Sequence, residues 1–288
     1  MRNVLVLGGI GQLGSCIQKL TGLQRGEYQY HFLDETKGNI LDEALLEKLF
    51  GEYQPAYVVN CAAYTAVDLA EDQFDIADAV NHLGAKNIAE ACKSHEVILL
   101  HVSTDFIFEG NSFRPLKEED AANPISVYGK TKLDGELAII TTLQDYFIIR
   151  TSWLYSEFGQ NFVKTMIKLG KGRDELGVIG DQVGTPTYAV DLADLIVFII
   201  ENRKTNFGVY HFSNEGVASW YDFAHEIFEL AGIELKLNAL TTEDYPTKAK
   251  RPPYSVMSKV KVKKELGYDV PNWRKSLKQC INAIKEQQ

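Results

Sequence analysis

The chain has 288 residues, of which 45% are hydrophobic, and carries a formal net charge of −9 with a pI near 5.3. This length allows one large domain or two modest ones with a packed core. The acidic balance, without any basic run, argues against nucleic acid or an anionic membrane surface as a partner. The N-terminus lacks a leader pattern and no apolar segment approaches ~18 residues, so we expect a soluble cytoplasmic protein.

Short apolar and β-branched runs in the first half predict buried strands at Val4 to Leu7, Tyr28 to Leu33, Tyr57 to Cys61, Val97 to Val102 and Phe147 to Arg150. Stretches of helical length and spacing lie between them, at Gln12 to Thr21, Asp42 to Tyr53, Asp72 to Lys93 and Val127 to Leu143. Alternation of this kind predicts an α/β fold with a doubly wound parallel sheet of the Rossmann type.

The pattern changes after residue 150. Helices are predicted at Asn161 to Leu169, Val190 to Asn202, Trp220 to Ala231 and Trp273 to Lys285, with one strand at Val209 to Phe212 and loop-rich segments at Gly177 to Thr187 and Thr241 to Ser255. We therefore predict a dinucleotide-binding domain over residues 1–152 and a smaller C-terminal substrate-binding lobe over 153–288. Residues 188–213 are expected to return to the Rossmann core.

A glycine-rich turn, G-G-I-G-Q-L-G, follows the first predicted strand directly and places Gly8, Gly11 and Gly14 three residues apart. Glycine permits the tight turn, close approach of the backbone to a pyrophosphate, and close packing of the helix on its strand, while the helix N-terminus faces the anion. The alternative is an ordinary strand–helix turn. Its position between a strand and an amphipathic helix favours a nucleotide site.

Asp34 lies at the end of the second predicted strand, twenty residues after Gly14. An acidic group there commonly meets the adenosine ribose hydroxyls and repels a 2′-phosphate, which favours NADH. Lys37 nearby could instead accommodate NADPH. We lean toward NADH, with a polar strand-end residue as the alternative role for Asp34.

Tyr128 and Lys132 are four residues apart, so on a helix the amine can approach the phenol. A positive charge there would lower the phenol pKa from ~10 and suit it to proton exchange. The alternative is a solvated pair on a helix surface. Thr104 adds a hydroxyl at a strand end, where propensity alone would also favour threonine.

The four cysteines, Cys16, Cys61, Cys92 and Cys280, are dispersed, without a C-x-x-C pair or a histidine at metal-ligand spacing. We expect reduced thiols and no metal site. His101 and His211 fall inside apolar strands, where a satisfied core histidine is the expected role.

Several motifs recur in the order of a known family: the glycine turn, N-C-A-A-Y-T-A-V-D from Asn60, V-S-T-D-F-I-F-E-G from Val102, Y-G-K-T-K from Tyr128, R-T-S-W-L-Y-S from Arg150, G-D-Q-V-G-T-P-T-Y from Gly180 and R-P-P-Y-S from Arg251. Over nearly the whole chain they resemble the extended short-chain dehydrogenase/reductases and, within them, the dTDP-4-dehydrorhamnose reductases. The chain departs from the family pattern at Phe106, commonly tyrosine, at Cys61, commonly alanine, and at Asn39, more often aspartate.

The resemblance implies NAD(P)H-dependent reduction of the C4 keto group of dTDP-4-dehydro-6-deoxy-L-mannose to dTDP-L-rhamnose, with Thr104, Tyr128 and Lys132 as catalytic residues and Tyr128 as proton donor. It implies cofactor contacts from Gly8, Gly11, Gln12, Leu13, Gly14, Asp34, Asn39, Ile40, Ala62, Ala63, Tyr64, Thr65, Val102, Tyr128 and Lys132. It implies substrate contacts from Thr104, Asp105, Trp153, Asn161, Gln182 and Arg251. Trp153 could instead be a core residue, Asp105 could bond a turn, and the last three could have surface roles. A homodimer is a candidate assembly.

Other functions stay open on the same fold. Another nucleotide-sugar 4-keto reductase, a 4-epimerase or a 4,6-dehydratase would share these motifs, although a dehydratase typically has an Asp-Glu pair after the threonine, where Asp105 and Phe106 stand here. A binding protein similar to the regulatory subunit of methionine adenosyltransferase would keep the nucleotide fold without redox chemistry, and would have no need of the Thr-Tyr-Lys set.

Overall fold

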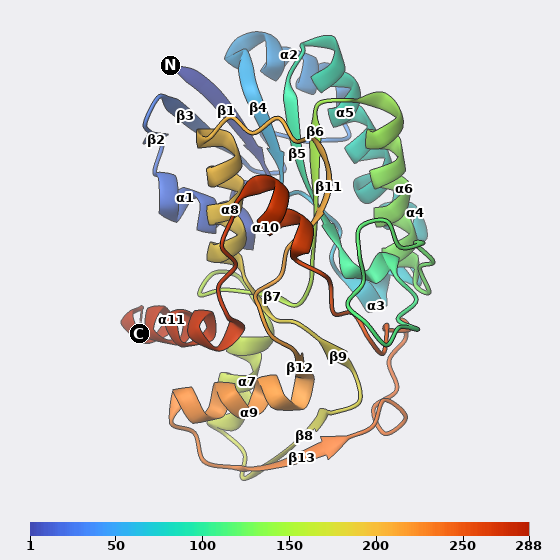
Figure 1. Ribbon diagram of the computed structural model, residues 1–288, viewed down its shortest axis with the longest axis vertical. Coiled ribbons are helices and arrows are strands. Elements are labelled where there is room, and N and C mark those ends of the chain that lie inside the picture. The colour runs from blue at the N-terminus through green and yellow to red at the C-terminus, as the bar shows by residue number, and fades with distance from the viewer. Residues whose placement is uncertain (288) are drawn as a thin grey trace.

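A seven-stranded sheet forms the centre of the computed structural model, which describes residues 1–287 (Figure 1). Its strand order is β11-β6-β5-β4-β1-β3-β2, and all neighbours are parallel except β2 and β3. The strands are β1 (Arg2–Leu7), β2 (Gln24–Arg25), β3 (Tyr28–Leu33), β4 (Pro55–Asn60), β5 (Ile98–Thr104), β6 (Tyr146–Thr151) and β11 (Gly208–His211). The predicted doubly wound parallel sheet is confirmed.

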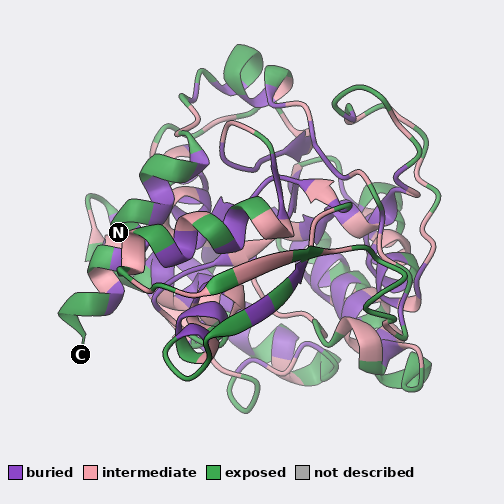
Figure 2. Ribbon diagram, turned by 90° about the horizontal axis from the view of Figure 1, so that it is seen from below, coloured by how far each residue is buried: buried purple, intermediate pink, exposed green. Residues whose placement is uncertain are grey.

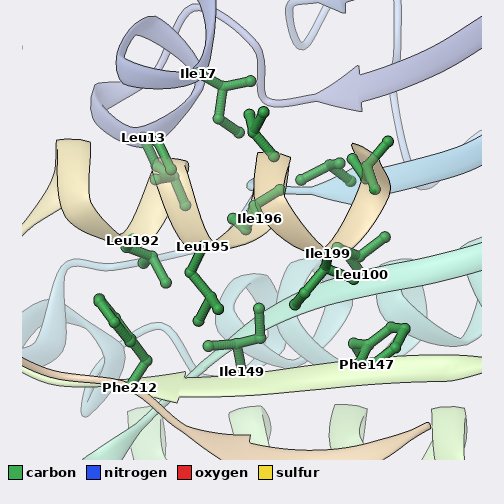
Figure 3. Packing of buried hydrophobic residues seen from close by; sticks show 14 of the residues in the cluster. Leu13, Ile17, Leu100, Phe147, Ile149, Leu192, Leu195, Ile196, Ile199 and Phe212 are labelled. Carbon is green, nitrogen blue, oxygen red and sulfur yellow. The ribbon is translucent and has the colours of Figure 1, made fainter. Parts of the chain in front are cut away.

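Helices cover both faces of this sheet. One layer contains α1 (Gln12–Thr21), α8 (Ala189–Glu201) and α10 (Val260–Leu266), and the other contains α2 (Glu43–Tyr53), α5 (Gly84–Ser94) and α6 (Val127–Thr142). Figure 3 shows the first layer, where Leu13 and Ile17 of α1 and Ile196 of α8 lie among the side chains packed on the sheet. A parallel sheet buried on both faces requires the continuous apolar runs seen in the sequence.

The segment predicted as one helix from Asp72 to Lys93 is helical but irregular. It contains α4 (Phe74–Asp78), a π turn η1 (Ala79–Leu83) and α5, and α3 (Val67–Ala70) precedes it. Within the π turn, the buried Asn81 side chain accepts from Tyr64 N (2.9 Å) and donates to Tyr64 O (3.1 Å) and Thr131 Oγ1 (3.1 Å). The chain that leaves β4 is thereby held against α6.

The second lobe has its own apolar core, centred on side chains such as Phe223 and Trp273. Its elements are β7 (Leu154–Tyr155), α7 (Phe162–Gly170), β8 (Glu175–Ile179), β9 (Val183–Gly184), β10 (Thr187–Tyr188), β12 (Ala218–Ser219), α9 (Trp220–Ala231), β13 (Lys236–Leu240) and α11 (Trp273–Glu286). Figure 2 shows buried residues inside both lobes and exposed residues on the outer helix faces. The chain returns from this lobe to the main sheet through α8 and β11.

One expectation for this lobe is wrong. Part of the segment from Gly177 to Thr187, expected as loop, belongs to strands, because β8 pairs in parallel with β13. The helix α10, which packs on the main sheet, was not predicted from the sequence. Both β8 and β13 are short, and each is stabilised by a partner about sixty residues away, so neither has a strong local pattern. No helix formed by residues 1–287 is long and apolar enough to span a membrane.

Candidate active site

The glycine turn packs directly on the chain that leaves β4. Gly8 has φ +71°, and a Cβ added there would lie 2.7 Å from Ala62 N, while one on Gly14 would lie 2.6 Å from Gly9 Cα. Gly11 begins α1 without any side-chain cap, so the first N–H groups of this helix are available to an anion. The turn therefore has the cradle that a pyrophosphate requires.

A cavity of about 450 Å³ lies beside this turn, at the carboxyl ends of the strands. The chain passes from β1 to β3 on one side and β4 lies on the other, which makes this the switch point where doubly wound sheets bind ligands. The cavity is lined by Gly11, Gln12, Leu13, Cys61, Ala63, Thr65, Val67, Val102, Ser103, Thr104, Asp105, Phe106, Tyr128, Lys132, Thr151, Ser152, Trp153, Leu154, Gln160 and Asn161. Twelve of these residues were predicted as site residues from the sequence.

Thr104 ends β5 and begins a short 3-10 turn, η2 (Asp105–Ile107). Its Oγ1 accepts from Phe106 N (3.2 Å) and donates to Asp105 Oδ1 (3.2 Å). Asp105 is buried, which raises the pKa of its carboxyl to about 6, and its Oδ2 atom has no hydrogen-bond partner within residues 1–287. A buried acceptor of this kind fits a polar ligand in the cavity.

The helix α6 carries the tyrosine and the lysine. Ser126 caps its start by accepting from Gly129 N (3.2 Å), and Tyr128 packs edge-on against Phe106 with ring centroids 5.5 Å apart. Both Tyr128 and Lys132 are buried in the cavity wall. The solvated-pair alternative is therefore excluded.

The expected lowering of the Tyr128 pKa is wrong for this structure. Burial raises the pKa of Tyr128 to about 12, although a hydrogen bond with Thr104 opposes the shift. The amine of Lys132 is itself buried, which lowers its pKa to about 8. Its polar contacts are to Val102 O (2.7 Å) and His101 Nε2 (3.3 Å) rather than to the phenol. Loss of solvent is therefore the main cause of the pKa shifts of both groups.

The second lobe closes the cavity with an aromatic wall. Trp153 has φ +48°, an uncommon value for a residue other than glycine, and stacks on Trp220 with centroids 3.6 Å apart and planes 9° from parallel. On the cavity side of the lobe, Asn161 caps α7 and donates to Gln12 Oε1 (2.9 Å). The glycine turn and the second lobe are thus joined directly.

Comparisons with known proteins agree with this geometry. The family model described as the RmlD substrate binding domain matches residues 1–286. The dTDP-4-dehydrorhamnose reductase of Aggregatibacter actinomycetemcomitans is 40% identical, over 99% of this chain and 100% of that protein. The chain belongs to the dTDP-4-dehydrorhamnose reductase family.

Solved structures of family members have the same fold. The dTDP-4-dehydrorhamnose reductase of Clostridium acetobutylicum is 43% identical, with a TM-score of 0.94 over 98% of this chain and 99% of that one. The enzyme from Bacillus anthracis, solved in complex with NADP, is 36% identical, with a TM-score of 0.94 over 98% of this chain and 100% of that one. The family and the fold predicted from the sequence motifs are confirmed, and the chain is an enzyme of this reductase family.

Several predicted contacts lie outside the cavity lining. Arg251 donates to both carboxylate oxygens of Asp68 (3.1 and 2.7 Å), and Gln182 donates to Thr242 Oγ1 (3.1 Å). Asp34 accepts from Lys37 N (2.9 Å) in the turn after β3. The remaining residues of this group are Gly8, Gly14, Asn39, Ile40, Ala62 and Tyr64. Their roles stay predictions.

Three residues that shape the site were missed or dismissed. Trp220 supports Trp153, and Gly184 leaves room for it, since a Cβ on Gly184 would lie 2.7 Å from the indole. Only the motif around Gly184 gave any indication in the sequence. His101 was interpreted as a core histidine, yet it contacts the amine of Lys132.

Proposed function

We propose that this chain reduces the C4 keto group of dTDP-4-dehydro-6-deoxy-L-mannose to give dTDP-L-rhamnose, with NADH or NADPH. The observation that carries the proposal is the convergence of Thr104, Tyr128 and Lys132 on one cavity beside the glycine turn. Relatives that match nearly the full chain are named for this activity.

The residues of the cavity fit a nicotinamide dinucleotide. The cradle at Gly8, Gly11 and Gly14 would hold the pyrophosphate, and the buried amine of Lys132 would hold ribose hydroxyls. A dinucleotide bound there would supply the hydride. Asp34, with Lys37 near it, would contact the adenosine ribose. The Asp34 carboxylate would favour NADH and the Lys37 side chain NADPH, and a relative was solved with NADP.

Tyr128 is proposed as the proton donor. Because burial holds its pKa at about 12, the phenol is protonated at neutral pH and has a proton to donate. Thr104, at the end of β5, would donate a second hydrogen bond to the same substrate oxygen. For this it must turn its hydroxyl away from Asp105, to which it donates here.

The sugar nucleotide is proposed to lie under the second lobe, residues 153–288, and against the dinucleotide-binding domain, residues 1–152. Asp105, Trp153 and Asn161 line the cavity and would contact the sugar. Gln182 and Arg251 would contact the nucleotide or its diphosphate, since a guanidinium suits phosphate oxygens. A cytoplasmic location and a homodimer stay predictions.

A coupled assay tests the activity. The purified protein is supplied with dTDP-glucose through a 4,6-dehydratase and a 3,5-epimerase, and consumption of NADH and NADPH is followed separately. We expect one reduced cofactor to be oxidised for each keto sugar converted. Turnover of sugar without net cofactor oxidation would indicate an epimerase. Absence of oxidation together with co-purification of an adenosyltransferase would indicate a regulatory subunit.

A further inference from the structure

A buried row of polar groups leads from the chain after β4 to the amine of Lys132. Ala62 N donates to Asn60 Oδ1 (3.0 Å), and Asn60 Nδ2 lies 3.1 Å from His101 Nδ1. On the other side of the ring, His101 Nε2 lies 3.3 Å from Lys132 Nζ, which lies 2.7 Å from Val102 O. The side chains of Asn60, His101 and Lys132 belong to residues only 1% exposed, so water does not compete for these contacts.

The backbone N–H of Ala62 determines the direction of every other hydrogen bond in the row. Ala62 N–H is a backbone donor, so the Asn60 oxygen must face it and the amide NH2 must face His101. His101 Nδ1 therefore accepts, and in a neutral imidazole the proton is then on Nε2. That N–H points at Lys132 Nζ, which accepts it only with the lone pair of a neutral amine.

An ammonium group at Lys132 cannot complete the same row, because it has no lone pair. His101 Nε2 would have to accept and Nδ1–H would have to donate, so Asn60 would turn its oxygen to the ring and its NH2 to Ala62 N–H. One contact between two donors would then remain in a site closed to water, which is costly. A protonated imidazole is no remedy, because burial and Lys132 lower the pKa of His101 well below its ordinary value.

The charged groups around the amine do not reverse this preference. Glu136, one turn along α6, attracts the ammonium form, but its carboxylate accepts from Arg150 Nε (3.0 and 3.1 Å) and Nη2 (2.7 Å). Tyr128, one turn earlier, is a neutral phenol at physiological pH. Asp105 faces Tyr128 from η2 and is the remaining carboxyl of the cavity lining.

We propose that Asn60 and His101 are positioning residues that bias Lys132 toward its neutral form by presenting a hydrogen-bond donor to its amine. The importance of this bias for turnover rests on the proposed reductase function. The charge of Lys132 in the free protein is independent of that function. Burial lowers the pKa of Lys132 to about 8 although Glu136 opposes the shift, and a bond formed only with the neutral amine acts in the same direction as burial.

The substitution Asn60→Asp should reverse the direction of the hydrogen bonds in the row, and the side chain keeps nearly the same shape. A carboxylate accepts both from Ala62 N–H and from His101 Nδ1–H, so Nε2 becomes an acceptor that favours the ammonium form. The measurement is the titration of the Lys132 ¹³Cε resonance in the free protein, assigned by its loss in Lys132→Met. We expect a midpoint at or below about 8 in the unaltered protein, against ~10.4 for an ordinary lysine. Asn60→Asp should raise it by ~1 pH unit or more.

The negative charge introduced by Asn60→Asp would itself raise the pKa of Lys132. The effect of this charge must therefore be measured apart from the effect of the imidazole. In a His101→Leu background the charge remains but the row is broken, and Asn60→Asp should then shift the midpoint by less than half as much. The matched control is Asn3→Asp, because Asn3 Oδ1 lies 3.1 Å from His31 Nε2 in a second Asn–His pair of the same sheet. It should leave the Lys132 midpoint unchanged.

The proposal is overturned by an ordinary midpoint for Lys132 in the unaltered protein, or by an equal shift from Asn60→Asp with and without His101. If Asn60→Asp fails to fold, His101→Leu alone replaces it, because it removes the donor that faces the amine of Lys132 and should also raise the midpoint. An unchanged midpoint in that variant contradicts the proposal. The titration needs no substrate, so an inactive coupled assay would affect the proposed function and not this result.

Discussion

The two halves of the cavity are built differently. In the half formed by β1, β4 and α1, the backbone of one segment packs directly on the backbone of another. In the half formed by the second lobe, side chains determine the shape. Gly8 lies against the backbone of Ala62 and Gly14 against that of Gly9. Trp153, in contrast, is held between the Trp220 ring and the space left by Gly184. Backbone cannot yield as side chains do, so we expect changes in the first half to abolish binding and changes in the second to adjust it.

The largest effect is expected for Gly14→Ala. The added Cβ would lie 2.6 Å from Gly9 Cα, so the turn must open, with a cost of about 3 kcal/mol in the free energy of unfolding. NAD(P)H affinity, measured by fluorescence titration, should fall beyond detection. The control is Gly51→Ala in α2, where an added Cβ meets no atom within 4 Å, and which should stabilise the protein by up to about 1 kcal/mol. Retained cofactor affinity in Gly14→Ala would refute the rigid cradle.

A smaller and more selective effect is expected for Gly184→Ala. The added Cβ would lie 2.7 Å from the Trp153 indole and 2.8 Å from Ser255 Oγ, and both side chains can shift. We expect KM for the sugar nucleotide to rise about tenfold, which corresponds to ~1.4 kcal/mol, with cofactor affinity unchanged. Gly180→Ala is the control, because its Cβ would only reach ordinary contact with Ala239 at 3.4 Å. Equal losses of cofactor and sugar affinity would mean that the two halves are not separable.

The smallest effects are expected at the ion pair between Arg251 and Asp68. Both side chains are partly exposed, and a pair of this kind contributes about 0–1 kcal/mol, so Arg251→Gln and Asp68→Asn should destabilise the fold slightly and alike. If Arg251 also binds the diphosphate, Arg251→Gln should raise KM for the sugar nucleotide severalfold more than Asp68→Asn does. Matching KM values in the two variants would restrict Arg251 to its contact with Asp68.

Features that depend on residues close together in the chain could be predicted from the sequence, whereas features that depend on distant residues could not. The glycine turn and the Tyr128–Lys132 pair are local patterns, and the structure places both beside one cavity. Strands β8 and β13, and the partner of Arg251, depend on contacts across about sixty and 183 residues, for which a single sequence has no local indication.

The spacing of residues in the sequence also does not predict how deeply a side chain is buried. The pattern predicted that Lys132 would lower the pKa of Tyr128, but the depth at which α6 lies in the cavity wall raises it. The same holds for His101, whose apolar strand correctly indicated burial but could not show that Lys132 lies beside it.

A single-turnover experiment with Tyr128→Phe tests whether Tyr128 donates the proton to the substrate. Enzyme, NADH or NADPH, and the 4-keto sugar are mixed rapidly, and cofactor oxidation is followed by absorbance, with cofactor affinity and thermal stability measured in parallel. We predict a rate at least ~100-fold lower with cofactor affinity and stability nearly unchanged, because only the phenolic hydroxyl is removed. A variant that oxidises the cofactor at close to the normal rate would contradict the assignment of Tyr128.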